Sequence, residues 1–407
     1  MPDIPSPRFD FADLDSLTAL YPLLARVRAE DPVHWAPQLN GWVTTRYADA
    51  VAALRDPALT SQRLALIVQY QLRHSDPAIA KDFERVCKQQ MLFRDGAEHH
   101  RLRVLGNRGF TPSVMERARP MVEGVVNDLL DKVQAKGQMD AIADFAQPLP
   151  AVAIAELFGI PASDRDLFQT WSDDVAKFFG GTHGDPATDG RAANDGMLAL
   201  EDYFLRLIEK RRPAPGHDLV SLLLAGQAEG KLSAEEVSAQ CILILIAGHV
   251  TTIDQMGNAL SAFLQHPEQW KKLRDDPTRI ATAVEEAIRY DPAAPFTHRI
   301  AIKETRIGDK TIKPGDVVYV GLAAGNRDPA AFPNPDTFDI ARSPNEHLSF
   351  AVGPHVCLGA GLARRELAIG IAALAKRMPN LRPAAEPPRR RCESLVFRGF
   401  HTLPVEF

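Results

Sequence analysis

The chain is organised around the stretch Phe350-Ala-Val-Gly-Pro-His-Val-Cys-Leu-Gly359, which presents one cysteine, Cys357, in a glycine-framed turn. An Ala/Leu/Arg-rich segment, residues 361–377, follows it and has the composition of a helix. A thiolate is the reactive and metal-binding form of cysteine, and backbone N–H groups and a helix N-terminus stabilise its charge. Gly353 and Gly359 carry no Cβ, so the backbone can turn tightly and approach a flat ligand closely. The stretch therefore fits a single axial metal ligand.

Two other interpretations of Cys357 remain open at this point. A lone cysteine in an arbitrary chain is more often a small, buried hydrophobic side chain. A zinc site needs more ligands than are present, because no second cysteine stands at C-x-x-C spacing and His347 and His355 lack further partners. The rest of the chain has to discriminate between these interpretations.

Length and composition describe one large domain, residues 1–407, since no Ser/Gly-rich or charged linker divides the chain. With 45% hydrophobic residues, the chain can build a core that encloses a cofactor. The net charge of -5, from 47 basic and 52 acidic residues, gives no indication of nucleic-acid binding. Four widely spaced cysteines do not resemble a disulfide framework, and we see neither a leader segment nor an apolar run of membrane-spanning length. We expect a soluble, cytoplasmic monomer.

A long buried helix is predicted in the second half of the chain. Ser233-Ala-Glu-Glu236 fits a capping box, and the helix continues to His266-Pro267, which at about 1.5 Å per residue spans about 50 Å. Residues 241–248 are apolar on all sides, so the helix is expected to be buried rather than amphipathic. Gly248 and the two threonines after it favour a kink that opens a small pocket, and the alternative is a packing site for small residues.

The cysteine stretch resembles the haem-binding signature of the cytochrome P-450 family, F-x-x-G-x-H-x-C-x-G, at every fixed position. Glu286-Ala-Ile-Arg289 is similar to the family's E-x-x-R motif, and residues 335–342, which end in Arg342, match its P-D-x-F-D-x-x-R segment. The resemblance covers nearly the whole chain. It implies a mainly α fold with small β-sheets, one haem b between the long helix and the cysteine loop, and Cys357 as the iron ligand. It also makes Glu286, Arg289 and Arg342 a structural network.

Residues 247–252, Ala-Gly-His-Val-Thr-Thr, resemble the family's oxygen-binding motif A/G-G-x-D/E-T-T/S. In the family, the acid and the alcohol of this motif deliver two protons for the cleavage of dioxygen, with ordered water between them. Here the alcohol is Thr251, but Val250 stands in place of the acid and cannot relay a proton. The resemblance assigns catalytic positions to Ala247, Gly248, Val250 and Thr251.

A set of cationic side chains is expected to hold the haem propionates. His99 and Arg103 lie at i and i+4 of a predicted helix, so both can grip one anion; the alternative is a solvated basic face. In the family, a similar D-P-P-x-H-x-x-x-R segment has this role, although Gly96 and Ala97 replace both prolines here. The cofactor-binding set implied by the resemblance is His99, Arg103, Arg299, Phe350, His355, Cys357 and Gly359, with Cys357 as the metal ligand.

Two further segments are expected near the substrate. Residues 180–190 read as a flexible polar loop that acts as a lid in the family. Residues 395–399 and 400–404 are predicted to form a closing hairpin, and the resemblance implies that its tip reaches the substrate. The predicted pocket residues are Leu243, Ile246, Ala247, Val250, Ala294, Phe296 and Val396, with Arg63, Leu64 and Val68 as additional contacts.

The resemblance implies a monooxygenase that takes two electrons from ferredoxin and ferredoxin reductase. It would insert one atom of dioxygen into a small apolar organic molecule in bacterial specialised metabolism. Val250 leaves atypical haem-thiolate chemistry open, such as oxidative coupling, nitration or peroxide-driven oxidation. A substrate group or a water held by Thr251 could also replace the acid. A different class, a non-catalytic haem-binding or sensor protein, is disfavoured by the retained Thr251.

Overall fold

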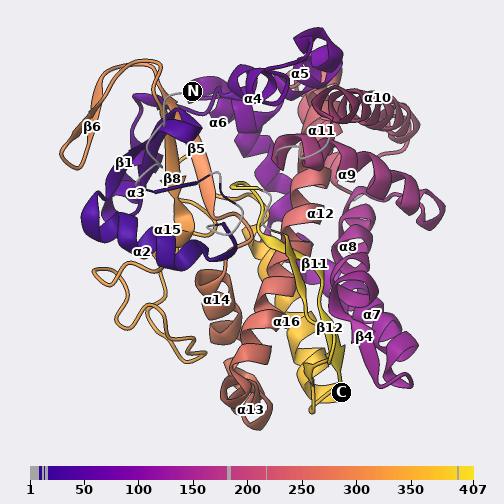
Figure 1. Ribbon diagram of the computed structural model, residues 1–407. Coiled ribbons are helices and arrows are strands. Elements are labelled where there is room, and N and C mark those ends of the chain that lie inside the picture. The colour runs from indigo at the N-terminus through magenta and orange to yellow at the C-terminus, as the bar shows by residue number, and fades with distance from the viewer. Residues whose placement is uncertain (1–8, 12, 14–16, 181–184, 217, 392–393) are drawn as a thin grey trace.

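The computed structural model describes residues 9–11, 13, 17–180, 185–216, 218–391 and 394–407. The fold is mainly helical with small sheets, as the resemblance implied. A long helix, α12 (Ala234–Gln265), crosses the middle of the molecule. The largest sheet lies on one side of α12, and helices α7 to α10 lie on the other (Figure 1). This central position makes α12 a wall for any site built between the two sides.

The other helices follow in chain order. They are α2 (Leu20–Glu30), α3 (Tyr47–Arg55), α4 (Leu64–Gln71), α5 (Lys81–Cys87), α6 (Gly96–Asn107), α7 (Pro112–Gln134), α8 (Pro148–Phe158), α9 (Arg165–Gly180), α10 (Pro186–Arg211), α11 (Leu219–Ala228), α13 (Pro267–Asp275), α14 (Ile280–Tyr290), α15 (Leu322–Asn326) and α16 (Ala360–Arg377). A π-helix, Ala141–Ala146, precedes α8.

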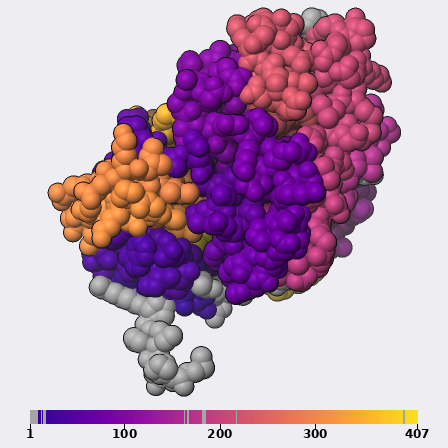
Figure 2. Space-filling view, turned by 90° about the horizontal axis from the view of Figure 1, so that it is seen from above, coloured from indigo at the N-terminus to yellow at the C-terminus, as the bar shows by residue number. Residues whose placement is uncertain are grey.

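The largest sheet has five strands in the order β1-β2-β8-β5-β3. Strands β2 and β8 pair in parallel, and the other neighbours are antiparallel. The β6–β7 hairpin, coloured orange, lies at the surface beside the indigo N-terminal part of the chain (Figure 2). The smaller sheets are β4-β12-β9, β10-β11 and β6-β7. The strands are β1 (Val33–Ala36), β2 (Gly41–Thr44), β3 (Leu59–Thr60), β4 (Gln138–Asp140), β5 (Phe296–Ala301), β6 (Thr305–Ile307), β7 (Lys310–Ile312), β8 (Val317–Gly321), β9 (Arg382–Pro383), β10 (Arg389–Arg391), β11 (Gly399–Thr402) and β12 (Pro404–Glu406).

The predicted capping box at the start of α12 is confirmed. Ser233 Oγ accepts a hydrogen bond from the Glu236 backbone N–H at 3.1 Å, and the Glu236 carboxylate accepts one from the Ser233 N–H at 3.0 Å. Contrary to expectation, two segments, Ala141–Phe158 and Ala234–Gln265, are long and apolar enough to cross a membrane. Because 56% and 67% of their apolar windows are buried in the fold, they have the character of core helices.

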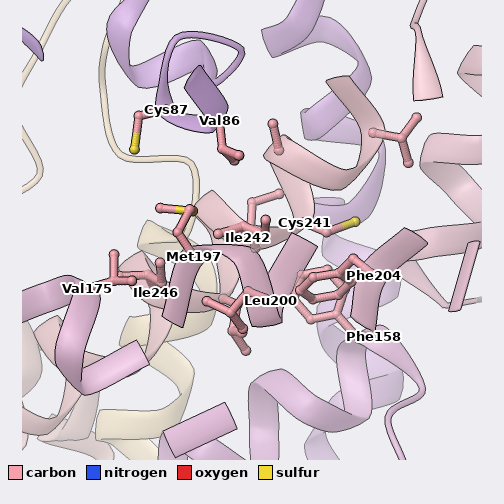
Figure 3. Packing of buried hydrophobic residues seen from close by; sticks show 14 of the residues in the cluster. Val86, Cys87, Phe158, Val175, Met197, Leu200, Phe204, Cys241, Ile242 and Ile246 are labelled. Atoms are coloured by element: carbon pink, nitrogen blue, oxygen red, sulfur yellow. The ribbon is translucent and has the colours of Figure 1, made fainter. Parts of the chain in front are cut away.

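Two large hydrophobic clusters pack on α12. One joins it to α8, α9, α10 and α11, and Figure 3 shows part of this cluster, with Ile242 and Ile246 of α12 among Val175, Met197 and Leu200. The other cluster joins the C-terminal half of α12 to α7, α14 and α16. Burial on both sides fixes the rotation of α12 about its axis, and this rotation decides which of its residues face the site.

Two local predictions are wrong. Helix α10 begins at Pro186, inside the segment expected to be a polar loop, because Asp185 caps the helix by accepting the Thr188 N–H at 3.0 Å. The C-terminal hairpin pairs residues 389–391 with 399–402, so residues 395–398 form its connection and not a strand. Part of the expected lid, residues 181–184, lies outside the described residues.

Candidate haem site

A cavity of about 330 Å³ separates α12 from the Cys357 turn. Its wall is predominantly apolar, and residues distant in sequence meet across it. One wall comes from α12, and the opposite wall comes from the turn and the first turns of α16. The residues predicted as site residues that do line it are Leu243, Ala247, Gly248 and Thr251 on one wall, and His99, Arg103, Ala294, Phe350, His355, Cys357 and Gly359 around the remainder.

The Cys357 turn is held by its own backbone. The Cys357 N–H donates to the Phe350 carbonyl oxygen at 2.8 Å, and the Val356 N–H donates to the Gly353 oxygen at 3.1 Å. Gly353 has a φ of 81°, and a Cβ there would come within 2.9 Å of the Leu54 carbonyl oxygen. Only glycine tolerates both the positive φ and the close carbonyl oxygen without strain, and this explains why the motif has a glycine at position 353.

Cys357 lies inside the fold, and the part of its side chain that is exposed lines the cavity. Burial raises the pKa of the thiol. A backbone hydrogen bond from Gly359, the charges of Arg103 and Arg364, and a backbone hydrogen bond from Ala360 oppose this effect. These groups would stabilise a thiolate bound to a metal, as the sequence suggested for the start of the following helix.

On the opposite wall, Ala247 is the exposed member of an otherwise buried helix turn because it faces the cavity. The Thr251 hydroxyl donates to the Ala247 carbonyl oxygen at 2.7 Å, which is the i−4 bond expected of a threonine at this position. Small side chains and a positioned hydroxyl therefore face the cysteine sulfur across the cavity.

One end of the cavity carries an excess of positive charge. The His99 and His355 rings lie 4.0 Å apart, and His355 Nε2 lies 3.0 Å from Asp95 Oδ1. Burial alone would raise the pKa of Asp95, but hydrogen bonds from His355 and Thr60 lower it to about 2, so the carboxyl is ionised. The cationic residues gathered with this one acid are Arg63, Arg103 and Arg299, together with the histidines His99, His298 and His355.

Two observations indicate that this end accommodates an anion. Arg63 is buried, its Nε has no partner, and the charge of Arg299 opposes its own. The Arg299 guanidinium is also buried, with bonds to the Thr297 hydroxyl at 3.3 Å and the His298 carbonyl at 2.9 Å. Haem carboxylates at this end would supply the missing negative charge. The residues present therefore fit haem.

Five predicted residues do not line the cavity. Ile246 and Val250 lie on a face of α12 that packs into the cluster shown in Figure 3, because each is turned about 60–100° away from Ala247. Phe296 packs edge-on against Phe11, with the ring centroids 6.3 Å apart. The remaining two are Arg299 and Val396. Arg299 donates a hydrogen bond to the hydroxyl of Thr297, which does line the cavity, and the Val396 N–H donates to Ser394 Oγ at 2.9 Å.

We therefore leave Ile246, Val250, Phe296 and Val396 out of the proposed pocket wall. Of the additional substrate contacts, Leu64 and Val68 are buried in the same cluster as Ile246, and Arg63 belongs to the cationic end.

Glu366 is a cavity residue that sequence reasoning missed. It lies on α16, is 1% exposed, and its Oε2 has no hydrogen-bond partner. Burial raises the pKa of its carboxyl to about 8, so it is protonated at neutral pH. The only signal in the sequence is an acid in the apolar helix after the cysteine turn. The other missed lining residues include Met91, Phe110, Gln255, Ile288 and Thr297.

The predicted structural network is confirmed behind the cysteine turn. Arg289 is fully buried, and its Nε and Nη2 donate to the two oxygens of Glu286 at 2.7 and 2.8 Å. Arg342 Nε donates to the same carboxylate at 3.1 Å. The remaining Arg289 donors go to the main-chain oxygens of Asn326, Pro335 and Thr337, at 2.8, 2.7 and 3.1 Å.

Comparison with known proteins agrees with this site. Residues 62–378 match the family model described as Cytochrome P-450. The chain is 40% identical to the biotin biosynthesis cytochrome P-450 of Bacillus subtilis over 95% of this chain and 96% of that protein. It is 36% identical to the polyketide biosynthesis cytochrome P-450 PksS of the same organism, over 95% of each chain.

A crystal structure of P-450 BioI in complex with an acyl carrier protein ligated with hexadec-9Z-enoic acid matches with a TM-score of 0.89 and 39% identity, over 97% of this chain and all of that one. The chain belongs to the cytochrome P-450 family, whose members bind haem b through a cysteine thiolate and act as monooxygenases.

Proposed function

We propose that the chain is a ferredoxin-dependent monooxygenase that oxidises a long apolar acyl chain, free or attached to a carrier protein, in bacterial biosynthesis. The observation that carries this proposal is the cavity with Cys357 on one wall and Ala247 and Thr251 on the other. The proposal assumes one domain, residues 1–407, and a cytoplasmic monomer.

Haem b, when bound, supplies the redox chemistry that activates dioxygen. Cys357 would hold its iron through the thiolate, and the N–H groups of Gly359 and Ala360 would stabilise the sulfur charge. Phe350 lines the cavity on the cysteine side, and the Arg364 guanidinium lies 4.5 Å from its ring centroid. His99, Arg103 and His355 would bind the haem carboxylates directly. Arg299 would contribute its positive charge from outside the cavity wall, where it is hydrogen-bonded to Thr297.

Ala247, Gly248 and Thr251 would form the oxygen-binding side. The small side chains leave room, and Thr251 Oγ keeps lone pairs free to accept from a water because its proton is donated to Ala247. Val250, packed in the core, neither holds nor passes a proton. Monooxygenase chemistry with dioxygen would therefore need a second proton-bearing group near Thr251.

The substrate class is argued from the cavity wall and the relatives. The predominantly apolar wall, including Leu243, Ile244, Phe110 and Ile154, would favour a hydrocarbon chain. The P-450 BioI structure contains a 16-carbon acyl chain on a carrier protein, which makes hexadec-9Z-enoic acid the first probe.

A ferredoxin would dock on the side of the cysteine turn. Arg108, just after α6, and Arg364, near the start of α16, have side chains that are 35% and 41% exposed and pair with Glu229 and Glu285. Exposed cations favour a negatively charged electron donor and accelerate its association.

The proposal is tested with the haem-loaded protein. The reduced carbon monoxide complex should show the red-shifted absorption of a thiolate ligand, and Cys357→Ser should abolish it. Hexadec-9Z-enoic acid should perturb the haem spectrum, and mass spectrometry should detect an oxygenated product with NADH, ferredoxin and ferredoxin reductase. An unshifted carbon monoxide spectrum would refute the ligand, and absence of both binding and product would refute the substrate class.

A second candidate function rests on Val250. Without an acid at this position, the enzyme could use peroxide directly or catalyse oxidative coupling or nitration. A product that forms with hydrogen peroxide and not with NADH and the redox partners would favour this alternative.

A further inference from the structure

A buried carboxylate, Asp254, lies on α12 one turn beyond the position where the acid is missing. It is 1% exposed and three residues after Thr251. Residues at this helical spacing have Cβ atoms about 5–6 Å apart, a separation that one water can bridge. No other acid on α12 lies within two turns of Thr251.

The helix rotation places Asp254 on the same side of α12 as the cavity-lining residues. Seven residues turn an α-helix through about 700°, so Asp254 lies within about 20° of Ala247 around the axis. Leu243, eleven residues before Asp254, also lies within about 20° of Asp254 around the axis, on the side opposite Ala247. Both Ala247 and Leu243 line the cavity. Beyond Thr251 the cavity wall continues along Thr252 and Gln255, and Asp254 lies beside this wall under β11, where a Cβ on Gly399 would collide with Asp254 Oδ1.

Asp254 is also connected toward the surface. Arg391 Nη2 of β10 donates to Asp254 Oδ2, and the Arg391 side chain is 29% exposed. The Arg391 Nε is buried without a partner, which leaves a donor for a water. The exposed Asp173 of α9 interacts electrostatically with Arg391, whose charge lowers the pKa of the Asp173 carboxyl. The partly exposed Arg391 therefore links the buried Asp254 to the protein surface.

The charges around Asp254 keep it able to change protonation. Burial raises its pKa, the cations Arg391 and Arg390 lower it, and Asp291 raises it, with a result of about 7. The negative charge of Asp291 is itself compensated by ion pairs with Arg390, at 2.9 Å, and with Arg398, at 3.0 Å. A carboxyl that titrates near neutral pH can both give and regain a proton during turnover.

We propose that Asp254 is the proton-relay acid of this enzyme, which passes protons through water to Thr251 in place of the acid that Val250 lacks. It is a positioning residue, because it acts on the oxygen site only through water and Thr251. The proposal rests on the monooxygenase function. In that reaction, one dioxygen, two electrons from NADH and two protons are consumed; one oxygen atom enters the substrate and the other leaves as water. Asp254 gives a proton toward the cavity and regains one from solvent past Arg391, so it is unchanged overall.

The main test compares wild type, Asp254→Asn and the double variant Val250→Glu/Asp254→Asn. With hexadec-9Z-enoic acid, NADH and redox partners, Asp254→Asn should lower product formed per NADH about tenfold or more and release hydrogen peroxide instead. The double variant should recover the coupling, because it returns an acid to position 250, immediately before Thr251. An uncoupling that the second substitution does not repair would show a structural role for Asp254, and unchanged coupling would also overturn the relay.

Peroxide-driven oxidation provides a matched control, because hydrogen peroxide brings both the oxygen and the protons. Product formation with peroxide should be equal in all three proteins, and a parallel loss in Asp254→Asn would refute the relay. If wild type makes no product by either route, the acyl substrate is wrong, and the relay is then tested by peroxide release during substrate-free NADH oxidation, which Asp254→Asn should raise.

An infrared titration tests the relay independently of activity. A Glu366→Gln/Asp173→Asn background removes two other carboxyls whose pKa values are raised toward neutrality, to about 8 and about 6. In this background the protein should show a protonated carboxyl band that disappears around pH 7, haem-free as well as haem-loaded. Arg391→Met removes the neighbouring cation and should move this titration to higher pH. The absence of a carboxyl titrating near neutrality, or a titration that Arg391→Met leaves in place, would overturn the proposal even if the Asp254→Asn protein did not fold.

Discussion

Replacing Glu286 by glutamine should destabilise the protein more than any exposed charge change on the same helix. Glu286 and Arg289 are both 0% exposed, and their two hydrogen bonds, of 2.7 and 2.8 Å, form a bidentate pair. Glutamine removes the negative charge and turns one acceptor into a donor that opposes the guanidinium. An uncompensated buried charge costs about 3–5 kcal/mol, and we expect a loss of this size in the free energy of unfolding.

The same substitution should weaken haem retention, because the network supports the segment that leads to the cysteine turn. Arg289 Nη1 donates to the Asn326 carbonyl at 2.8 Å. The Asn326 side chain in turn accepts the Leu348 N–H at 2.6 Å and donates to Ser349 Oγ at 2.8 Å. A displaced Arg289 therefore loosens the residues immediately before Phe350. Transfer of haem to apomyoglobin should be faster from Glu286→Gln than from wild type.

Glu285→Gln is the matched control on the adjacent residue. Glu285 is 28% exposed and pairs with Arg364, which is 41% exposed, and with the buried His347 at 3.1 Å, so its loss should cost less than the loss of the fully buried Glu286. Urea unfolding followed by far-ultraviolet circular dichroism measures both variants. Equal losses for Glu285→Gln and Glu286→Gln, or a loss below about 1 kcal/mol for Glu286→Gln, would refute the reasoning from burial.

Three further predictions concern the cavity. Val250→Glu alone should leave haem binding intact and change the ratio of product to hydrogen peroxide; an unchanged ratio would separate position 250 from proton delivery. Arg103→Gln should weaken haem affinity about 10–100-fold in a haem-transfer assay, since a hydrogen bond to a charged group contributes about 1.5–3 kcal/mol; unchanged affinity would remove Arg103 from the carboxylate donors. The folded-state pKa of Glu366 is raised to about 8, so the stability that wild type has below the unfolded pKa is lost as pH rises through about 8. Glu366→Gln has no such titration and should gain on wild type by several kcal/mol between about pH 5 and pH 9 in urea unfolding, at about 1.4 kcal/mol per pKa unit; parallel pH profiles would contradict the burial of a neutral acid.

The sequence was most informative where one residue type is required by local geometry. The Cys357 turn needs glycine at 353, where φ is 81°, and the capping box at Ser233 needs only a side chain three residues away. The network of Glu286, Arg289 and Arg342 was predictable through its motif, although its long-range carbonyl partners were not. The start of helix α10 is a case where two local signals conflict: the glycine-rich composition of residues 180–190 favours a loop, but the helix-start signal of Asp185-Pro186 prevails.

The face of α12 that meets the cavity could not be read from the sequence, because the helix is apolar on all sides and its periodicity selects no direction. Packing against α8 to α11 and against α7, α14 and α16 sets the rotation, which sends Ile246 and Val250 into the core and leaves Ala247 and Thr251 at the cavity. The same rotation gives Asp254 its place in line with Ala247. In the sequence alone, this aspartate is one acid in an apolar helix. It becomes a candidate for the missing proton donor only when β10 and β11, more than a hundred residues later, bury it beside Arg391.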